Sequence, residues 1–211
     1  ELERFKPTET SPLREAWHLA PEHYAFGVVG SYDLPRGKGQ REFLQAAARI
    51  KDTLPHARFL IVGSGSLLPT LQADIQSLGL QDRAQILPWC NDMPAAMNAL
   101  DCLVHPQVGT EALGGVILEA HACGRPVVAT AVDGIPEAFR DGGLGRLIPT
   151  ESIDALATAM IETARESRLS MAERLSLHER VAAKSSTESA CRNFERLYRS
   201  LPRLRDRNST P

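Results

Sequence analysis

Two carboxylates eight positions apart, Glu111 and Glu119, lie on either side of Gly114 and Gly115 in the stretch GTEALGGVILEAHACGRPVVATAVDGIPE. Glycines at a helix start let a ligand approach backbone amides that lack intrahelical partners and lie at the positive end of the helix dipole. We therefore expect a phosphate site at the glycine pair. If both glutamates were helical, they would lie roughly 12 Å apart along the axis, which suits the two ends of a nucleotide sugar.

Arg36 and Lys38 lie in a second glycine-containing loop that precedes a predicted helix. Their cations could neutralise a diphosphate held by the amides near Gly114. The alternative is an exposed turn with solvated charges. The loop is not a Walker A motif, because its spacing from Gly30 is too long and Gly39 stands where Ser or Thr would hold magnesium. Phosphoryl transfer is therefore disfavoured.

Gly63 begins a second glycine-rich stretch, GSGSLL, after a predicted strand. The third glycine of a dinucleotide fingerprint is absent and no acidic residue ends the next strand, so hydride transfer is only a weak alternative to a tight turn at the edge of a ligand site.

Trp89 ends a further strand, where it either lies near a base or covers the core. His105 and His121 lie nearest the predicted cleft, and we assign neither a chemical role.

Glu119 interrupts an apolar helical run, where an ionised group buried without partners would cost several kcal/mol. It follows Gly115 by four residues and so shares its helix face. Ribose hydroxyls could donate to this carboxylate. The alternative is a structural ion pair with Lys or Arg.

The composition excludes several function classes. The chain has 211 residues and a formal net charge of -2, with no basic stripe that would indicate nucleic acid. Its four cysteines (Cys90, Cys102, Cys123 and Cys191) form no CxxC pair, which favours reduced thiols over a disulfide framework or metal site. No apolar run approaches a membrane span and the first residues do not resemble a secretory signal, so we expect a soluble cytoplasmic chain.

Short apolar runs alternate with amphipathic stretches, the pattern of βαβ units and a parallel sheet. The predicted fold is α/β, a Rossmann-like doubly wound six-stranded sheet with helices on both faces, in the order 3-2-1-4-5-6. The predicted strands are Tyr24 to Gly30, Arg58 to Gly63, Ala84 to Pro88, Asp101 to His105, Pro126 to Thr130 and Gly145 to Ile148. Helical spacing covers Gln40 to Thr53, Leu67 to Leu78, Asp92 to Leu100 and Gly114 to Cys123, and helices follow from Ser152 to about Tyr198.

This strand order predicts where the site lies. Ligands bind doubly wound sheets outside the carboxyl ends of the first and fourth strands, and the two unusual loops, 31–40 and 106–115, follow those strands. We expect three parts: residues 1–23 as linker and leading helix, 24–200 as the binding domain with its C-terminal helices, and 201–211 as a frayed tail.

With these residues in place, the chain resembles the C-terminal, donor nucleotide-binding half of retaining glycosyltransferases of the GT-B fold, the family called GT4 or glycosyl transferases group 1. The resemblance runs from about Phe26 to Tyr198. The matching elements, in the family's order, are KG (Lys38, Gly39), FLIVGSG (Phe59 to Gly65), E-x7-E (Glu111 to Glu119), ACGRPVVAT (Ala122 to Thr130) and DGIPE (Asp133 to Glu137).

The resemblance implies a role for each element. Glu119 would bind ribose hydroxyls, Glu111 would lie by the donor sugar and phosphates, and Lys38 would neutralise the diphosphate. Amides of Leu113, Gly114 and Gly115 would hold the diphosphate, and backbone groups around Trp89 and Cys90 would meet the base. The donor would be a nucleotide-diphosphate sugar such as a UDP- or GDP-sugar, with no cofactor and no metal.

Two departures from the family pattern concern the diphosphate loop and the glycine turn. Ser31 follows Gly30 where the family commonly has Arg, with Arg36 as a possible substitute. Ala112 and Leu113 replace the Gly-Phe of the usual E-G-F-G. Diphosphate binding survives these changes more readily than donor preference does.

The resemblance also implies a half that this chain lacks. A separate N-terminal domain would hold a saccharide or lipid-linked acceptor, as in cell-envelope polysaccharide synthesis, so we expect the chain to be inactive in isolation, and the full-length protein could be peripheral at the inner face of a membrane. The rivals are a GT-B nucleotide-sugar epimerase and a non-catalytic nucleotide-binding module. Base, sugar, acceptor and oligomeric state stay open.

Overall fold

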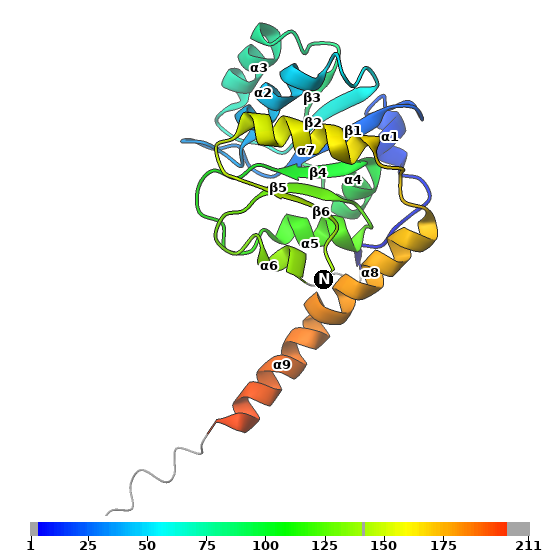
Figure 1. Ribbon diagram of the computed structural model, residues 1–211, viewed down its shortest axis with the longest axis vertical. Coiled ribbons are helices and arrows are strands. Elements are labelled where there is room, and N and C mark those ends of the chain that lie inside the picture. The colour runs from blue at the N-terminus through cyan, green and yellow to red at the C-terminus, as the bar shows by residue number, and fades with distance from the viewer. Residues whose placement is uncertain (1–3, 141, 202–211) are drawn as a thin grey trace, which may run out of the picture.

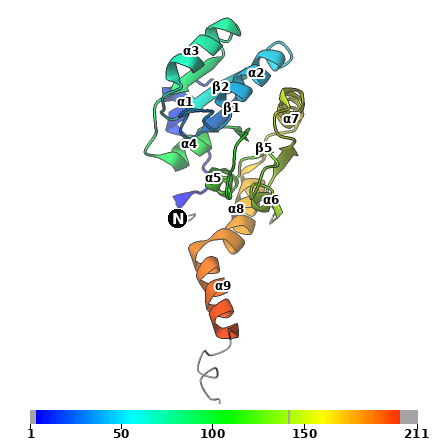
Figure 2. The ribbon, with the colours of Figure 1, turned by 90° about the vertical axis from the view of Figure 1, so that its left-hand side faces the viewer.

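The computed structural model describes residues 4–140 and 142–201 and is built on one parallel sheet between two layers of helices (Figures 1 and 2). Its strands run in the order β3-β2-β1-β4-β5-β6, with every neighbouring pair parallel, as the sequence predicts. The strands are β1 (Tyr24–Val29), β2 (Ala57–Val62), β3 (Ala84–Leu87), β4 (Cys102–His105), β5 (Val127–Thr130) and β6 (Gly145–Ile148).

Alternating side chains of the central strands supply two separate cores. From β1 and β2, Phe26 and Phe59 point into one core, while Ala25 and Leu60 point into the other, because successive residues of a strand face opposite sides of a sheet. The first core is covered by α2 (Gln40–Ile50), α3 (Leu68–Ser77) and α7 (Ile153–Arg165). The second is covered by α1 (Pro12–Ala16), α4 (Met93–Ala99), α5 (Gly115–Ala122) and α8 (Met171–Ser185).

Local signals fix most of the helix ends. Ser152 accepts a hydrogen bond from the Ala155 amide and caps α7, at the residue where the sequence predicts the C-terminal helices to begin. Gly79 and Gly124 have φ of 63° and 70° and follow the ends of α3 and α5, the left-handed position at which a glycine ends a helix. The short helix α6 (Glu137–Arg140) was not predicted from the sequence, since four residues carry no helical period.

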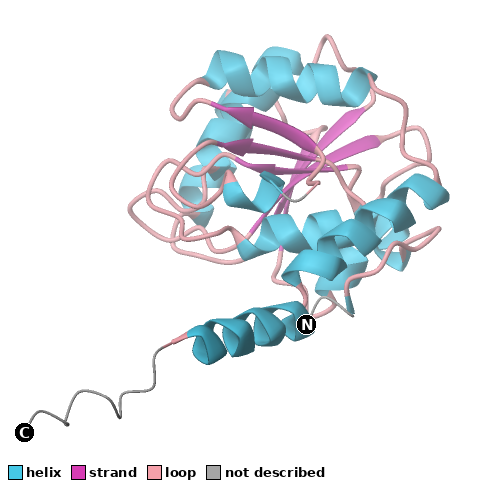
Figure 3. Cartoon of the chain, turned by 60° about the horizontal axis from the view of Figure 1, so that its bottom comes forward, coloured by secondary structure: helices cyan, strands magenta, loops and turns pink. Residues whose placement is uncertain are grey.

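The last helix, α9 (Thr187–Ser200), extends away from the rest of the molecule (Figures 2 and 3). Four large apolar side chains on it and just beyond it are more than half exposed: Phe194, Leu197, Tyr198 and Leu201. The predicted frayed tail lies outside the described residues from 202 onward. All four cysteines are free thiols; Cys102 and Cys123 are buried, Cys90 is partly buried and Cys191 is exposed.

Candidate functional site

The two loops that the sequence places after β1 and β4 meet at the carboxyl edge of the sheet. The Lys38 ammonium lies 2.7 Å from a carboxylate oxygen of Glu111, and a Cβ on Gly39 would come within 2.1 Å of the Pro106 carbonyl oxygen. The backbones of the two loops are therefore in direct contact. The predicted convergence of residues 73 positions apart is confirmed by this geometry.

Gln40 fixes the conformation of the lysine loop. Its buried side chain accepts a hydrogen bond from the Lys38 amide at 2.7 Å and donates to the Ser31 carbonyl oxygen at 3.2 Å. Gly39 caps α2 with φ of 83°, a conformation that glycine adopts without strain. The side chain of Lys38 therefore projects from a loop whose backbone is held at both ends.

Glu111 is held by the loop that follows β5. Its amide donates to a carboxylate oxygen of Asp133 at 3.1 Å, and the Gly134 amide donates to its carbonyl oxygen at 3.2 Å. Its second carboxylate oxygen accepts from the Gly114 amide at 3.3 Å. Because α5 begins only at Gly115, Glu111 is not helical, so the 12 Å axial separation from Glu119, which assumed one helix, does not apply.

The charges around Glu111 keep its carboxyl ionised. Burial alone raises its pKa, but the hydrogen bond and charge of Lys38, together with the Gly114 amide, outweigh burial and lower the pKa below its usual value. His105 lies at the end of β4, with its Nε2 atom 3.7 Å from a Glu111 oxygen. Burial lowers the pKa of His105 to about 4, so its imidazole is neutral at pH 7.

The start of α5 has the form of an anion site. Gly114 precedes the helix with φ of 71°, and a Cβ on Gly115 would meet nothing within 4 Å. The Leu113 side chain is 40% exposed and leaves the turn open to solvent. Amides at such a helix start favour a negatively charged group, and the sequence predicts a phosphate at this turn. Its role in holding a diphosphate stays a prediction.

Glu119 lies beside this turn in a groove that also includes Gly115, Asn91 and Met93. Among the described residues, its carboxylate has neither an ion pair nor a hydrogen bond, so no described Lys or Arg supplies the structural alternative. Burial raises the pKa of the Glu119 carboxyl. A half-buried carboxylate without a partner among the described residues is suited to accept from the hydroxyls of a ligand.

The remaining predicted site residues lie at the same edge with different surroundings. Gly63 follows β2 with its backbone against Gly30, where a Cβ would come within 2.1 Å of the Gly30 carbonyl oxygen. Trp89 is 54% exposed and therefore does not cover the core. The Cys90 thiol, also after β3, contacts the Asp92 carbonyl oxygen at 3.4 Å.

Arg36 does not join the Lys38–Glu111 pair. Its guanidinium lies 3.1 Å from Glu151, in the loop between β6 and α7, and both side chains are well exposed. The sequence placed Arg36 near the diphosphate because it is close to Lys38 in the chain. In the structure the two side chains leave the loop toward different partners.

Sequence reasoning placed His105 near the cleft but assigned it no role, and it missed Gln40. The position of His105 at the end of the fourth strand was a usable signal, because that strand end borders the ligand site of a doubly wound fold. Gln40 offered no such signal, since a glutamine at the start of a helix is common.

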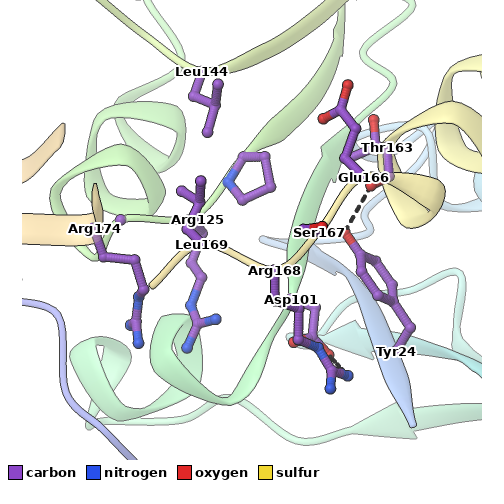
Figure 4. Close-up of a pocket in the computed structure, with 12 residues that line it drawn as sticks. Tyr24, Asp101, Arg125, Leu144, Thr163, Glu166, Ser167, Arg168, Leu169 and Arg174 are labelled. Carbon is purple, nitrogen blue, oxygen red and sulfur yellow. Dashed lines mark hydrogen bonds and ion pairs between the residues drawn. The ribbon is translucent and has the colours of Figure 1, made fainter. Parts of the chain in front are cut away.

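A second pocket lies at the opposite edge of the sheet, by the amino ends of the strands (Figure 4). Its charged groups are engaged in structural bonds: Asp101 pairs with Arg14 and Arg168, while Arg125 and Arg174 donate to carbonyl oxygens of Asn98 and Cys123 near the ends of α4 and α5. These contacts join α8 to the sheet domain and point to a structural role.

Within residues 4–140 and 142–201, no group of three or more His, Cys, Asp or Glu side chains could hold a metal ion. No helix there has both the length and the apolar character that crossing a membrane requires.

Comparison with known proteins identifies a family of glycosyl transferases. The model of the family described as glycosyl transferases group 1 matches residues 23–166. The D-inositol 3-phosphate glycosyltransferase of Mycobacterium marinum is 35% identical over 167 residues, which cover 76% of this chain and 34% of that protein. The chain therefore spans about a third of this curated relative.

Two solved structures are similar over most of the chain. HepE of Anabaena, in complex with UDP-glucose, has a TM-score of 0.78 and 26% identity, covering 95% of this chain and 56% of its own. The C-terminal domain of a glycosyl transferase group 1 family protein from Francisella tularensis has a TM-score of 0.73 at 21% identity, covering 89% of this chain and 98% of its own. The latter is similar in fold to this chain over almost its whole length.

Proposed function

The chain belongs to the glycosyl transferases group 1 family, as the C-terminal domain of a GT-B fold, and from this premise we propose that it binds the nucleotide-diphosphate sugar donor of a retaining glycosyltransferase. The Lys38–Glu111 pair at the start of α5 is the observation that carries the proposal. It brings a cation, a carboxylate and the amides at the start of a helix to one edge of the sheet. The complex of HepE with UDP-glucose supports the ligand class.

The proposed chemistry is electrostatic. Lys38 and the amides of Leu113, Gly114 and Gly115 stabilise the nucleoside diphosphate as it leaves and the donor sugar gains positive charge. Glu119 accepts from the ribose hydroxyls and so fixes the position of the donor. Backbone groups near Trp89 and Cys90 contact the base, and Gly63 leaves room at the edge of the site.

The charge on the leaving diphosphate is balanced by protein groups in this proposal, without a metal or other cofactor. An ammonium and helix amides together can stabilise the charge that a divalent cation stabilises in other enzymes. We therefore expect chelation of divalent cations with EDTA to leave donor binding unchanged.

The acceptor, a saccharide or lipid-linked molecule, is held in this proposal by an N-terminal domain outside the present sequence. Relatives with which the chain aligns over only 34% or 56% of their length support this division. The apolar side chains of Phe194, Leu197 and Tyr198 on α9 support it too, because such a patch on an extended helix is typical of a surface that another part of a protein covers.

A non-catalytic nucleotide-binding module is the second candidate. Ser31 stands where the resemblance to the family implies an Arg, and Arg36, its possible substitute, is paired with Glu151. If this candidate were correct, the full-length protein would bind nucleotide sugars but would neither transfer nor hydrolyse them. An epimerase would instead release an altered or free sugar without an acceptor.

Calorimetry with UDP, GDP, ADP and their parent nucleosides tests the binding proposal. Lys38→Ala should weaken binding of the diphosphate on the order of tenfold to a hundredfold and leave nucleoside binding nearly unchanged, because a charge-assisted bond to phosphate is lost. Arg36→Ala is the matched control for loss of a cation from the same loop. Equal losses for nucleoside and diphosphate in Lys38→Ala would show that the lysine only supports the fold.

A further inference from the structure

His105 is a buried side chain with no hydrogen-bond partner. It is 2% exposed, and neither ring nitrogen has a partner among the described residues. Most buried polar side-chain atoms in proteins are hydrogen-bonded, so an imidazole with two unsatisfied nitrogens requires an explanation. Its Nε2 atom is 3.7 Å from the Glu111 oxygen that contacts Lys38, beyond hydrogen-bond distance.

We propose that His105 is a positioning residue that takes over the Glu111 carboxylate when a nucleoside diphosphate draws Lys38 away from it. The inference rests on the proposed function, since it requires a diphosphate at the start of α5. Without ligand, Glu111 accepts from Lys38 and from the Gly114 amide. Both donors are the groups to which the diphosphate would bind.

The bound diphosphate therefore leaves Glu111 with fewer donors beside a second anion. An ionised carboxylate that is only 16% exposed needs hydrogen bonds to remain in place. His105 is a nearby donor that a diphosphate would not reach, because the imidazole is buried with its Nε2 atom 3.7 Å from Glu111. A movement of about 1 Å brings Nε2 and the carboxylate oxygen to hydrogen-bond distance, with the proton on Nε2.

A neutral imidazole is suited to this exchange. It donates to Glu111 without placing a second full charge beside Lys38. A histidine that stayed positively charged would hold Glu111 so strongly that it would compete with Lys38 before the ligand arrived. The exchange thus keeps the Glu111 carboxylate oriented toward the donor sugar while Lys38 moves to phosphate.

The test measures binding of UDP, GDP and ADP, each against its parent nucleoside, by calorimetry on the 211-residue chain. His105→Phe keeps a planar ring without a donor and should weaken diphosphate binding on the order of tenfold to a hundredfold, with little change for the nucleoside. His105→Gln, whose amide can donate from a similar place, should restore most of the affinity. In a Lys38→Ala background, His105→Phe should have no further effect on the ratio of diphosphate to nucleoside affinity.

His121→Phe is the matched control, because His121 is equally buried and its Nε2 atom donates to the Leu144 carbonyl oxygen, away from Glu111. It should leave both affinities unchanged. Equal losses for nucleoside and diphosphate in His105→Phe, or no loss, would overturn the inference. Failure of the unmodified chain to bind any of the three diphosphates would instead reject the proposed function.

An NMR measurement on the unmodified chain covers the case in which His105→Phe does not fold. The Nε2 proton of His105 should shift downfield on saturation with the diphosphate and not with the nucleoside, because a hydrogen bond to a carboxylate forms. An unchanged resonance would contradict the exchange of partners.

Discussion

The half-buried Glu119 carboxylate is kept in the site without an ion pair or hydrogen bond among the described residues. Such an arrangement lowers the stability of the free protein, since burial disfavours the charged form. Residues of this kind are characteristic of ligand sites, where the missing partner is supplied on binding. The role of Glu119 is therefore best tested by measuring stability and affinity together.

Glu119→Ala should weaken nucleoside diphosphate binding by about 1 to 3 kcal/mol, the range for hydrogen bonds to a charged group. The free energy of unfolding should stay equal or increase, because the substitution removes a half-buried carboxylate that has no partner among the described residues. Calorimetry and urea denaturation give the two values. A 2′,3′-dideoxy nucleotide that binds the unmodified chain as well as its parent does would exclude Glu119 as the ribose ligand.

Two buried histidines should make stability depend on pH. Burial lowers the pKa of both His105 and His121 to about 4 from the ordinary 6.5. The unfolded chain therefore binds more protons than the folded chain between these values. The free energy of unfolding thus has its full value above pH 6.5 and decreases as the pH drops toward 4. Each histidine contributes a slope of about 1.4 kcal/mol per pH unit in this range.

Urea denaturation between pH 7 and pH 4.5 measures this slope. The lowered pKa of Glu111 acts in the same direction, but mainly below the ordinary pKa of a glutamate, 4.5. His121→Phe should reduce the slope by the contribution of one histidine. A slope that is the same in this variant would show that His121 is already protonated in the folded chain or remains accessible to water.

At the scale of elements, two loop contacts determine the site. The loop after β1 contacts the loop after β4 through Gly39 and Pro106, and the loop after β5 holds the Glu111 backbone through Asp133 and Gly134. Each strand thus delivers a loop to the same edge, and glycine is required where backbones touch. Substitution of these glycines should act on the site through the backbone.

Gly39→Ala should destabilise the fold by more than about 1 kcal/mol and weaken diphosphate binding, because alanine at φ of 83° is strained and its Cβ would meet the Pro106 carbonyl oxygen. Gly115→Ala is the control substitution, made at a second glycine of the same site. Its Cβ meets nothing and alanine favours a helix, so stability should be retained. Thermal or urea denaturation separates the two; similar losses in both would contradict this account.

At the scale of the whole molecule, two cores around one continuous sheet form a complete layered domain. The domain of a group 1 family protein from Francisella tularensis with the same fold matches over 98% of its own length. A domain of this architecture contains its own cores and does not need a partner to bury its sheet. In the proposal, the acceptor side of the cleft belongs to an N-terminal domain outside the present sequence.

We therefore expect the 211-residue chain to fold and to bind a nucleoside diphosphate while transferring no sugar at an appreciable rate. Groups that orient an acceptor supply a large part of the rate, and in the proposal they lie outside this sequence. The nucleotide sugar and the diphosphate should bind with similar affinity, because the sugar stays in contact with water. Calorimetry tests the binding statements and a transfer assay tests the lack of activity. Efficient transfer by the chain alone would refute the division into a donor domain and a separate acceptor domain.

The sequence by itself determined the six strands, most of the helices, the strand order and the edge at which the candidate site lies. Runs of apolar residues, left-handed glycines after helices and the cap at Ser152 are local signals, and the order of parallel strands then fixes which loops meet. The loops that carry Lys38 and Glu111 were brought together on this reasoning alone. It requires only that strand ends be placed correctly.

Only the tertiary structure decided which side chains become partners. It placed His105 beside Glu111, turned Arg36 to Glu151 and began α5 after Glu111. These outcomes depend on side-chain direction and loop packing within a few ångströms, between residues up to 115 positions apart in the chain. Periodicity and turn signals report on the local backbone and carry no information about such long-range contacts.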